Sequence, residues 1–241
     1  MSKVFLKFNR TDSFSLVCLL HWLEVFKGHE IFIVCDLYDT VKDQIPSYLS
    51  SLILGKNIKV INSNYTLGDK YTPEFKARKR KMASANLTCF NYLTKKDKLF
   101  WIIDADDTMF LTKDYENLSA RLHRAEDIMK QENLDGFSLD FYRSLNNTWT
   151  FGVCLLRSDI NWQQVENIKK EDLDKENLVY NSDSIFDYLG RKGILKLKNF
   201  VFPGYGFQHI INNYPAMPAG IYFWNNKKVW DIPLKDDVIE I

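Results

Sequence analysis

Several features that mark other protein classes are absent from this sequence. Its four cysteines, at positions 18, 35, 89 and 154, form no CxxC pair, so we interpret them as small core residues in a reducing compartment. No apolar run reaches about 18 residues, and residues 1–10 contain no signal-peptide core, so we expect neither a transmembrane helix nor secretion. The net charge of +1 gives no general electrostatic case for binding nucleic acid or an anionic membrane.

The sequence does contain enough apolar surface for one large domain, because 46% of its 241 residues are hydrophobic. In the first third, apolar runs of strand length alternate with helical spacing. Strands are predicted at Val4–Phe8, Glu30–Asp36, Ile58–Ile61 and Leu99–Ile103, with helices from Ser13 and across residues 74–93. This order predicts an α/β fold with a mostly parallel sheet and helices on both faces.

The second half of the chain is less regular. The patterns predict helices at Tyr115–Glu132 and Ser184–Leu189, and strands at Gly136–Tyr142, Thr150–Leu156 and Ile194–Val201. From Pro203 onward the chain is rich in Pro, Gly and aromatic residues, which predicts an irregular C-terminal region packed over a site. Without an internal repeat or a low-complexity linker, residues 1–241 are expected to form a single domain.

The most informative stretch is Trp101–Asp107, in which an apolar strand ends in three carboxylates within four residues. Because side chains alternate along a strand, Asp104 and Asp106 leave it on the same side. Close like charges are unfavourable without a cation, and Mg²⁺ or Mn²⁺ prefers carboxylate oxygens shared with substrate phosphates. The stretch therefore predicts a metal site, with a solvated acidic turn as the alternative.

Polar residues also follow other predicted strands. Asn9 follows the first strand, and Asp36 ends the second. Ligands of parallel sheets bind at the carboxyl ends of the strands. We therefore expect Asn9, Asp36 and Asp104–Asp107 to share one cleft.

Taken together, these segments resemble a glycosyltransferase of the GT-A fold, closest to the family 2 type, over roughly residues 3–210. The segments that carry the resemblance, in the family's order, are Phe8-Asn9, Ile31–Asp36 with Asp39-Thr40, Met82–Asn86, Asp104–Asp107, Phe151–Val153, Asn181–Asp183 and His209. The resemblance implies a Rossmann-like sheet, with the nucleotide sugar bound by residues 1–110 and the acceptor by residues 111–241.

The resemblance also implies roles for individual residues. It makes Asp183 the catalytic base, and it implies that Mn²⁺ or Mg²⁺ is held by Asp104, Asp106, Asp107 and His209. The implied donor contacts are Asn9, Asp36, Lys81, Asn86, Asp104 and Ala105. The sequence departs from the family at Ala85, where Arg is common, so contact with phosphate falls to Lys79 or Lys81. It departs again at Ser182, which replaces the usual acid beside Asp183.

The implied reaction moves a sugar from a nucleotide sugar, with a UDP-sugar favoured, to a glycan or glycolipid acceptor. The metal offsets the negative charge of the leaving diphosphate. Asp183 activates the acceptor hydroxyl, and direct attack by that hydroxyl inverts the anomeric centre. We expect a cytoplasmic protein without a nucleic-acid partner, which a glycolipid acceptor can bring to the inner face of a membrane.

Alternative interpretations remain for four of these features. Asp183 can cap the helix that follows it, His209 can be a structural histidine, and Asp36 can belong to a plain turn at the strand exit. The basic run Lys76–Lys81 is interpreted first as a solvated helix face, because consecutive charges wrap round a helix, then as a phosphate contact and last as a nucleic-acid patch.

Other functions are also compatible with parts of the sequence. Asp104–Thr108 matches the motif of haloacid-dehalogenase-type phosphatases, with Asp104 as nucleophile and Asp106 as acid/base, but that motif normally follows the first strand of its domain. A nucleotidyltransferase would need a Gly-rich loop after the first strand, which is absent here. A non-catalytic nucleotide- or carbohydrate-binding module is the remaining alternative.

Overall fold

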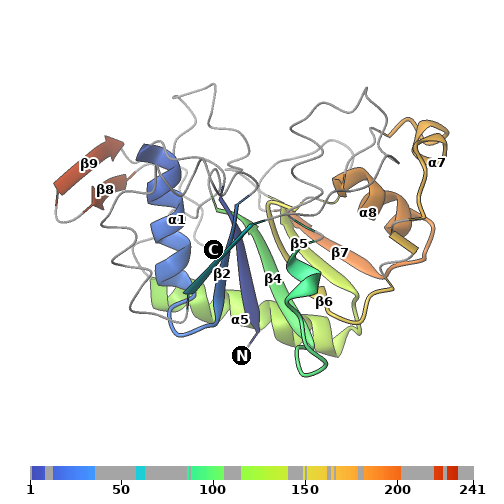
Figure 1. Cartoon of the computed structure of the whole chain (residues 1–241), viewed down its shortest axis with the longest axis horizontal. Helices are drawn as coiled ribbons and strands as arrows, with labels where there is room; N and C mark the ends of the chain where they lie inside the picture. Colours follow the sequence, from blue (N-terminus) through green and yellow to red (C-terminus); the bar gives the residue numbers. More distant parts are fainter. Residues whose placement is uncertain are drawn as a thin grey trace.

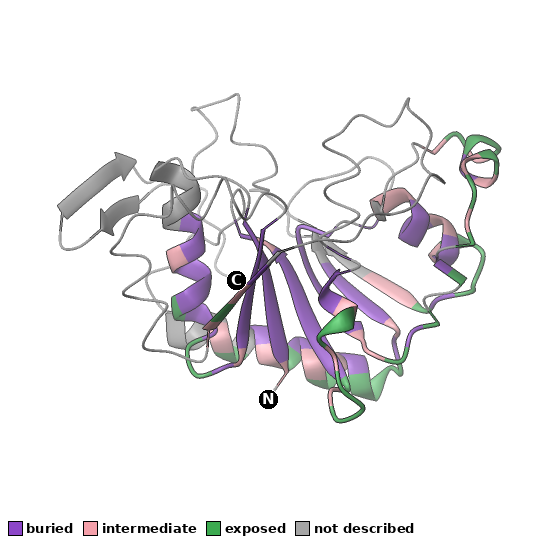
Figure 2. Ribbon diagram, viewed as in Figure 1, coloured by how far each residue is buried: buried purple, intermediate pink, exposed green. Residues whose placement is uncertain are grey.

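In the computed structural model of the chain, the described residues are 2–8, 13–35, 58–62, 86, 88–105, 115–140, 149, 151–161, 164–165, 167–178, 182–201, 220–224 and 227–232. These residues build a seven-stranded sheet in the order β3-β2-β1-β4-β6-β5-β7 (Figure 1). The central strands are buried along their length (Figure 2).

The first half of the sheet is parallel. It comprises β1 (Lys3–Lys7), β2 (Ile31–Cys35), β3 (Ile58–Asn62) and β4 (Leu99–Asp104). The chain runs outward from β1 to β2 and β3, and it then returns to the other side of β1 with β4. The order of the strands therefore reverses between β1 and β4, which is where ligands of such sheets bind.

The second half of the sheet mixes directions. It comprises β5 (Gly136–Asp140), β6 (Val153–Arg157) and β7 (Leu197–Val201). Strand β6 runs antiparallel to both β4 and β5, while β7 is parallel to β5. The prediction of a mostly parallel sheet is confirmed, with β6 as the reversed strand.

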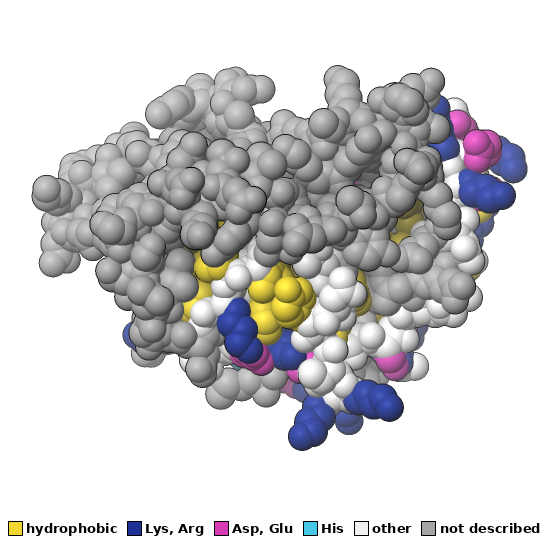
Figure 3. Space-filling model, in the orientation of Figure 1, with side chains coloured by type: hydrophobic (Ala, Val, Ile, Leu, Met, Phe, Trp, Pro, Cys, Tyr) yellow, Lys and Arg dark blue, Asp and Glu magenta, His cyan; other side chains and the backbone are white. Residues whose placement is uncertain are grey.

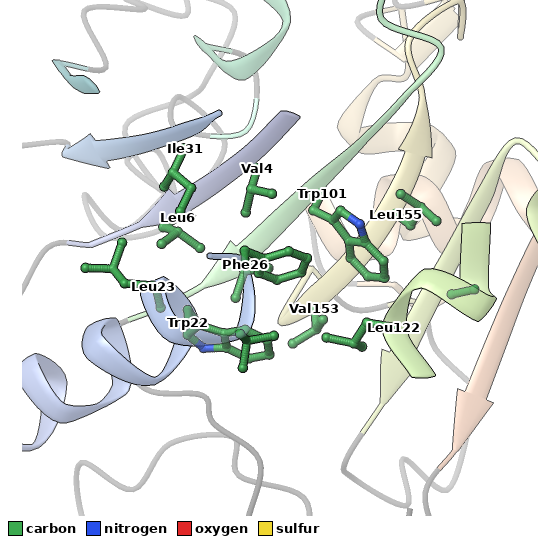
Figure 4. Close-up of a cluster of buried hydrophobic side chains, with 14 of the residues drawn as sticks. Val4, Leu6, Trp22, Leu23, Phe26, Ile31, Trp101, Leu122, Val153 and Leu155 are labelled. Atoms are coloured by element: carbon green, nitrogen blue, oxygen red, sulfur yellow. The ribbon is translucent and has the colours of Figure 1, made fainter. Parts of the chain in front are cut away.

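Two apolar layers cover the sheet. On one face lie α1 (Ser13–Val25) and α5 (Tyr115–Gln131). The buried side chains of this layer include Val4, Leu6, Leu19, Trp22, Phe26, Trp101, Leu122, Met129 and Leu155 (Figure 4). The other face carries α7 (Lys170–Asp174), α8 (Ser182–Arg191) and a helical turn containing Cys89. Its buried side chains include Phe5, Phe32, Phe100, Ile102, Phe151, Leu173, Phe186 and Leu189.

The alternation of side chains along β1 and β4 determines which face each residue joins. Val4 and Leu6 pack on the α1 face, whereas Phe5 packs on the α8 face. The same alternation in β4 sends Trp101 to the α1 face and Ile102 to the α8 face. The same alternation directs Lys7, which ends β1, and Asp104, which ends β4, to the α8 face.

The C-terminal region differs from the irregular structure expected there. It contains an antiparallel pair formed by β8 (Gly220–Trp224) and β9 (Lys227–Ile232). The aromatic and β-branched residues in this stretch favour strands, which explains the difference.

The short helix α7 was also not predicted. Most of the predicted helix across residues 74–93 lies outside the described residues, but residues 86 and 88–91 are helical.

The surface carries mixed charge. On the face shown in Figure 3, Lys and Arg side chains of the described residues lie among Asp and Glu side chains at the lower edge and on the right. This mixture agrees with a net charge of +1. Within the ranges given above, no helix combines the length and the apolar character needed to cross a bilayer.

Candidate active site at the carboxyl ends of β1 and β4

The candidate site begins where β1 and β4 end side by side. Lys7 and Asp104 are the last residues of these strands, and they are partners in the parallel register. The carboxyl ends of the parallel strands lie at one edge of the sheet. The start of β6 lies at the same edge, because β6 is antiparallel to β4.

The side chains of Lys7 and Asp104 form a buried ion pair. Lys7 Nζ lies 2.6 Å from Asp104 Oδ1, and the two side chains are 3% and 17% exposed. Burial lowers the pKa of the Lys7 ammonium, but the adjacent carboxylate of Asp104, with smaller contributions from Cys154 and Asp183, holds that pKa above its ordinary value. Lys7 is therefore a permanent cation at the strand end.

Backbone hydrogen bonds hold the end of β4 from both sides. The N–H of Ala105 donates to the carbonyl of Lys7 at 2.9 Å, and the N–H of Asp104 donates to the carbonyl of Gly152 at 2.7 Å. Asp104 and Ala105 are therefore fixed between β1 and the segment that leads into β6. The acidic motif continues directly from this fixed point.

Asp183 joins the same edge from α8. It is the second residue of that helix, and its Oδ1 accepts a hydrogen bond of 2.8 Å from the N–H of Phe151. The ring of Phe151 meets that of Phe186 edge-on, with 4.7 Å between centroids. The Phe151 ring also lies 5.8 Å from Lys7 Nζ, so Asp183 contacts the backbone of the residue whose ring lies near Lys7. The structure thus brings Asp183 close to the end of β4.

Asn86 is a buried amide with unused hydrogen-bonding capacity. Its residue is 3% exposed, and neither its side-chain nitrogen nor its oxygen has a hydrogen-bond partner in the described structure. Leaving a buried polar group unsatisfied is costly, so such groups indicate a missing partner. This observation is compatible with the predicted contact between Asn86 and a ligand.

The other predicted site residues lie outside the described residues: Asn9, Asp36, Lys81, Asp106, Asp107 and His209. Among the residues that are described, no group of three or more His, Cys, Asp or Glu side chains is arranged to hold a metal ion. Asp104 is instead neutralised by Lys7.

Lys7 is the site residue that the sequence analysis missed. It sits inside the predicted strand Val4–Phe8, and its residue is only 2% exposed. Lysine is almost never fully buried without a partner. A lysine near the carboxyl end of an apolar strand was therefore a usable sign of a buried acidic partner at the same sheet edge.

Comparison with solved structures identifies the fold of this chain. The mannosyltransferase PcManGT from Pyrobaculum calidifontis, solved with GDP-Man and Mn²⁺, aligns with a TM-score of 0.51 and 11% identity over 89% of this chain. Mouse xyloside xylosyltransferase 1, in its apo form, aligns with a TM-score of 0.55 and 8% identity over 83% of this chain. The chain has a GT-A-like fold.

The extent of these similarities differs. The alignment covers 58% of the mannosyltransferase chain and 84% of the xylosyltransferase chain. No protein-family model matches the sequence. No curated protein sequence matches it either. At these identities the similarity concerns the GT-A-like fold alone.

Proposed function

We propose that this chain is a metal-dependent glycosyltransferase that moves a sugar from a nucleotide sugar to a glycan or glycolipid acceptor. The observation that carries the proposal is the position of the acidic motif in a GT-A-like fold. Strand β4 ends in Asp104 beside β1, at the reversal of strand order, and the sequence continues with Asp106 and Asp107. Residues 1–110 would bind the donor and residues 111–241 the acceptor.

The proposed metal is Mn²⁺ or Mg²⁺. Carboxylate oxygens suit either ion, and the candidate metal ligands are Asp104, Asp106, Asp107 and His209, of which Asp104 is already paired with Lys7. When bound, the ion would supply Lewis-acid stabilisation of the charge on the leaving diphosphate. Asn86 fits a donor-binding role, because its buried amide has hydrogen-bonding capacity to spare.

Asp183 is proposed as the general base that accepts the proton of the acceptor hydroxyl as it attacks. The Phe151 N–H fixes the carboxylate through Oδ1. An Asp183→Asn variant keeps an oxygen to accept this hydrogen bond and removes only the basicity. Its turnover should fall by about 10²-fold or more with donor affinity retained. Normal turnover would reassign Asp183 to holding α8 against Phe151.

Binding of the donor gives the most direct test. We expect a UDP-sugar to raise the melting temperature in the presence of Mn²⁺, and GDP-mannose is tested beside it because the similar mannosyltransferase was solved with GDP-Man. EDTA should abolish the shift, and so should Asp106→Asn. Full stabilisation of the metal-free protein by UDP would contradict the proposed metal bridge.

A panel of UDP-, GDP-, CMP- and dTDP-sugars, each with and without Mn²⁺, identifies the nucleotide. Incubating the stabilising donor with glycan and glycolipid acceptors then tests transfer itself. Tight donor binding without transfer to any acceptor would favour a non-catalytic binding module. A glycolipid acceptor would bring the protein to a membrane surface.

A further inference from the structure

The cation at the candidate site is a side chain of the protein itself. Lys7 is the one charged residue in the sequence Val-Phe-Leu-Lys-Phe, and it lies on the α8 face with Phe5. Burying an ammonium group is unfavourable unless a counter-charge offsets the loss of its hydration. Its position at the end of β1, beside Asp104, makes that counter-charge part of the acidic motif.

We propose that Lys7 is a positioning residue for donor binding, which fixes Asp104 and Ala105 so that the rest of the acidic motif begins from a defined place. In this arrangement Asp104 is the partner of Lys7 and not a ligand of the metal. The inference rests on the proposed function and names a residue that the resemblance did not include.

Three contacts act together on the same two residues. The Lys7 ammonium binds the Asp104 carboxylate at 2.6 Å. The Lys7 carbonyl accepts the Ala105 N–H at 2.9 Å, and the Gly152 carbonyl accepts the Asp104 N–H at 2.7 Å. Asp106 follows one residue later. Binding groups must be held within about 0.5 Å of their productive geometry, so the position of Asp104 and Ala105 affects each carboxylate of the motif that comes after them in the sequence.

The charges separate Asp104 from the metal-binding carboxylates. An ammonium group 2.6 Å from Asp104 Oδ1 already neutralises this carboxylate. A divalent cation at the same carboxylate would lie close to the Lys7 ammonium group and be repelled by it. Asp106 and Asp107 are the carboxylates that remain for the metal.

The chain offers a matched control on the same strand. Lys3 also lies on β1, with its Nζ 3.0 Å from a carboxylate oxygen of Asp97 and 5.7 Å from the centre of the Phe32 ring. Lys3 and Asp97 lie near the opposite edge of the sheet, because Lys3 begins β1 and Asp97 precedes β4. A Lys3→Met, Asp97→Asn double variant therefore removes an equivalent pair far from the candidate site.

The experiment measures the affinity for UDP and for GDP in the presence of Mn²⁺ by calorimetry, at a temperature where circular dichroism shows each variant folded. Lys7→Met, Asp104→Asn and their double variant should each weaken binding by about tenfold or more, as expected for groups that orient ligands. Because the two side chains act as one unit, the three losses should be equal. The control double variant should bind like wild type.

The possible results separate the alternatives. If Lys7→Met binds as well as or better than wild type while Asp104→Asn loses binding, Asp104 is a metal ligand and the inference is overturned. If the Lys7→Met, Asp104→Asn double variant folds and binds like wild type, the pair is only structural and the inference is overturned. This double variant leaves no unpaired charge, so it gives the answer even if Lys7→Met alone fails to fold. If wild type binds neither nucleotide with Mn²⁺, the proposed function fails and the inference with it.

Discussion

Lys3 and Lys7 lie near opposite ends of strand β1, on the same face of the sheet, and each pairs with an aspartate from the chain around β4. Lys3 also donates to the carbonyl of Tyr92 at 2.8 Å. Asp97 accepts hydrogen bonds from the backbone and the hydroxyl of Thr94. The Lys3–Asp97 pair, at the edge of the sheet where β1 begins, therefore holds a turn that has other contacts of its own.

The Lys7–Asp104 pair, at the carboxyl ends of β1 and β4, differs because the candidate site begins at it. Asp104 is the last residue of β4, and the acidic motif continues from it. The Lys7 side chain is 3% exposed, against 11% for Lys3, so its charge has less access to water. The same two residue types therefore have different consequences at the two ends of one strand: one pair supports a turn, and the other sets the start of the candidate site.

The largest expected difference between the two pairs is in the free energy of unfolding lost when the lysine is replaced, and this loss should be greatest at Lys7. Lys7→Met leaves the Asp104 carboxylate without its counter-charge, and breaking a buried pair in this way costs about 3–5 kcal/mol. Urea unfolding should show this loss as a lower midpoint. The Lys7→Met, Asp104→Asn double variant should regain most of it. A loss below about 1 kcal/mol would place the pair among exposed salt bridges.

The equivalent substitution at the amino edge should cost less. Lys3→Met removes a charged hydrogen bond and the ion pairs with Asp97 and Glu30, but Asp97 keeps its hydrogen bonds from Thr94. We expect a loss of about 1–3 kcal/mol in the same urea measurement. If Lys3→Met proves as costly as Lys7→Met, the difference in burial between the two pairs does not control their strength.

The two edges should also respond differently to acid. At the amino edge, burial lowers the pKa of His29, and the nearby His123 and the positive amino terminus lower it further, while the Ser2 carbonyl and Glu126 act in the opposite sense. The ordinary pKa of 6.5 applies in the unfolded chain. The contribution of His29 to stability is therefore complete above this pH and is lost as the pH falls towards the folded-state pKa.

Urea unfolding at several pH values between about 7.5 and 5 tests this response. One proton can change the free energy of unfolding by at most about 1.4 kcal/mol per pH unit. The slope should decrease in His29→Gln, whereas Lys7 remains charged over this range and should contribute nothing to it. An unchanged slope in His29→Gln would assign the acid sensitivity to another group.

The smallest expected effect is on thiol reactivity beside Lys7. Burial raises the pKa of the Cys154 thiol well above its ordinary value, although the charge of Lys7 acts in the opposite sense. Because burial is the larger cause, alkylation of Cys154 should be slow in the native protein and unchanged in the Lys7→Met, Asp104→Asn double variant. Mass spectrometry of the alkylated peptide measures the rate. A faster reaction in the double variant would mean that the ion pair shields the thiol.

Most of the sheet was predictable from the sequence, because buried parallel strands are continuous apolar runs. The predicted strands Val4–Phe8 and Leu99–Ile103 correspond to β1 (Lys3–Lys7) and β4 (Leu99–Asp104) within one residue. The direction of β6 was not predictable, because a strand buried on both faces shows no polar alternation that would identify its neighbours.

The candidate site was predictable only in part. Asp104 was predicted because three carboxylates after an apolar run can be recognised from the sequence alone. Its pairing with Lys7 depends on the register between two strands separated by about ninety residues of sequence. The bond between Asp183 and the Phe151 N–H likewise joins two segments that only the folded chain brings together.

The register between β1 and β4 also determines where the chain can change length. Inserting one residue within β4 would turn Asp104 to the opposite face of the sheet, because side chains alternate along a strand. An insertion in the turn at residues 94–98 would leave the pairing of Lys7 with Asp104 intact. Insertions and deletions should therefore be tolerated in the connection before β4 and excluded from its six residues.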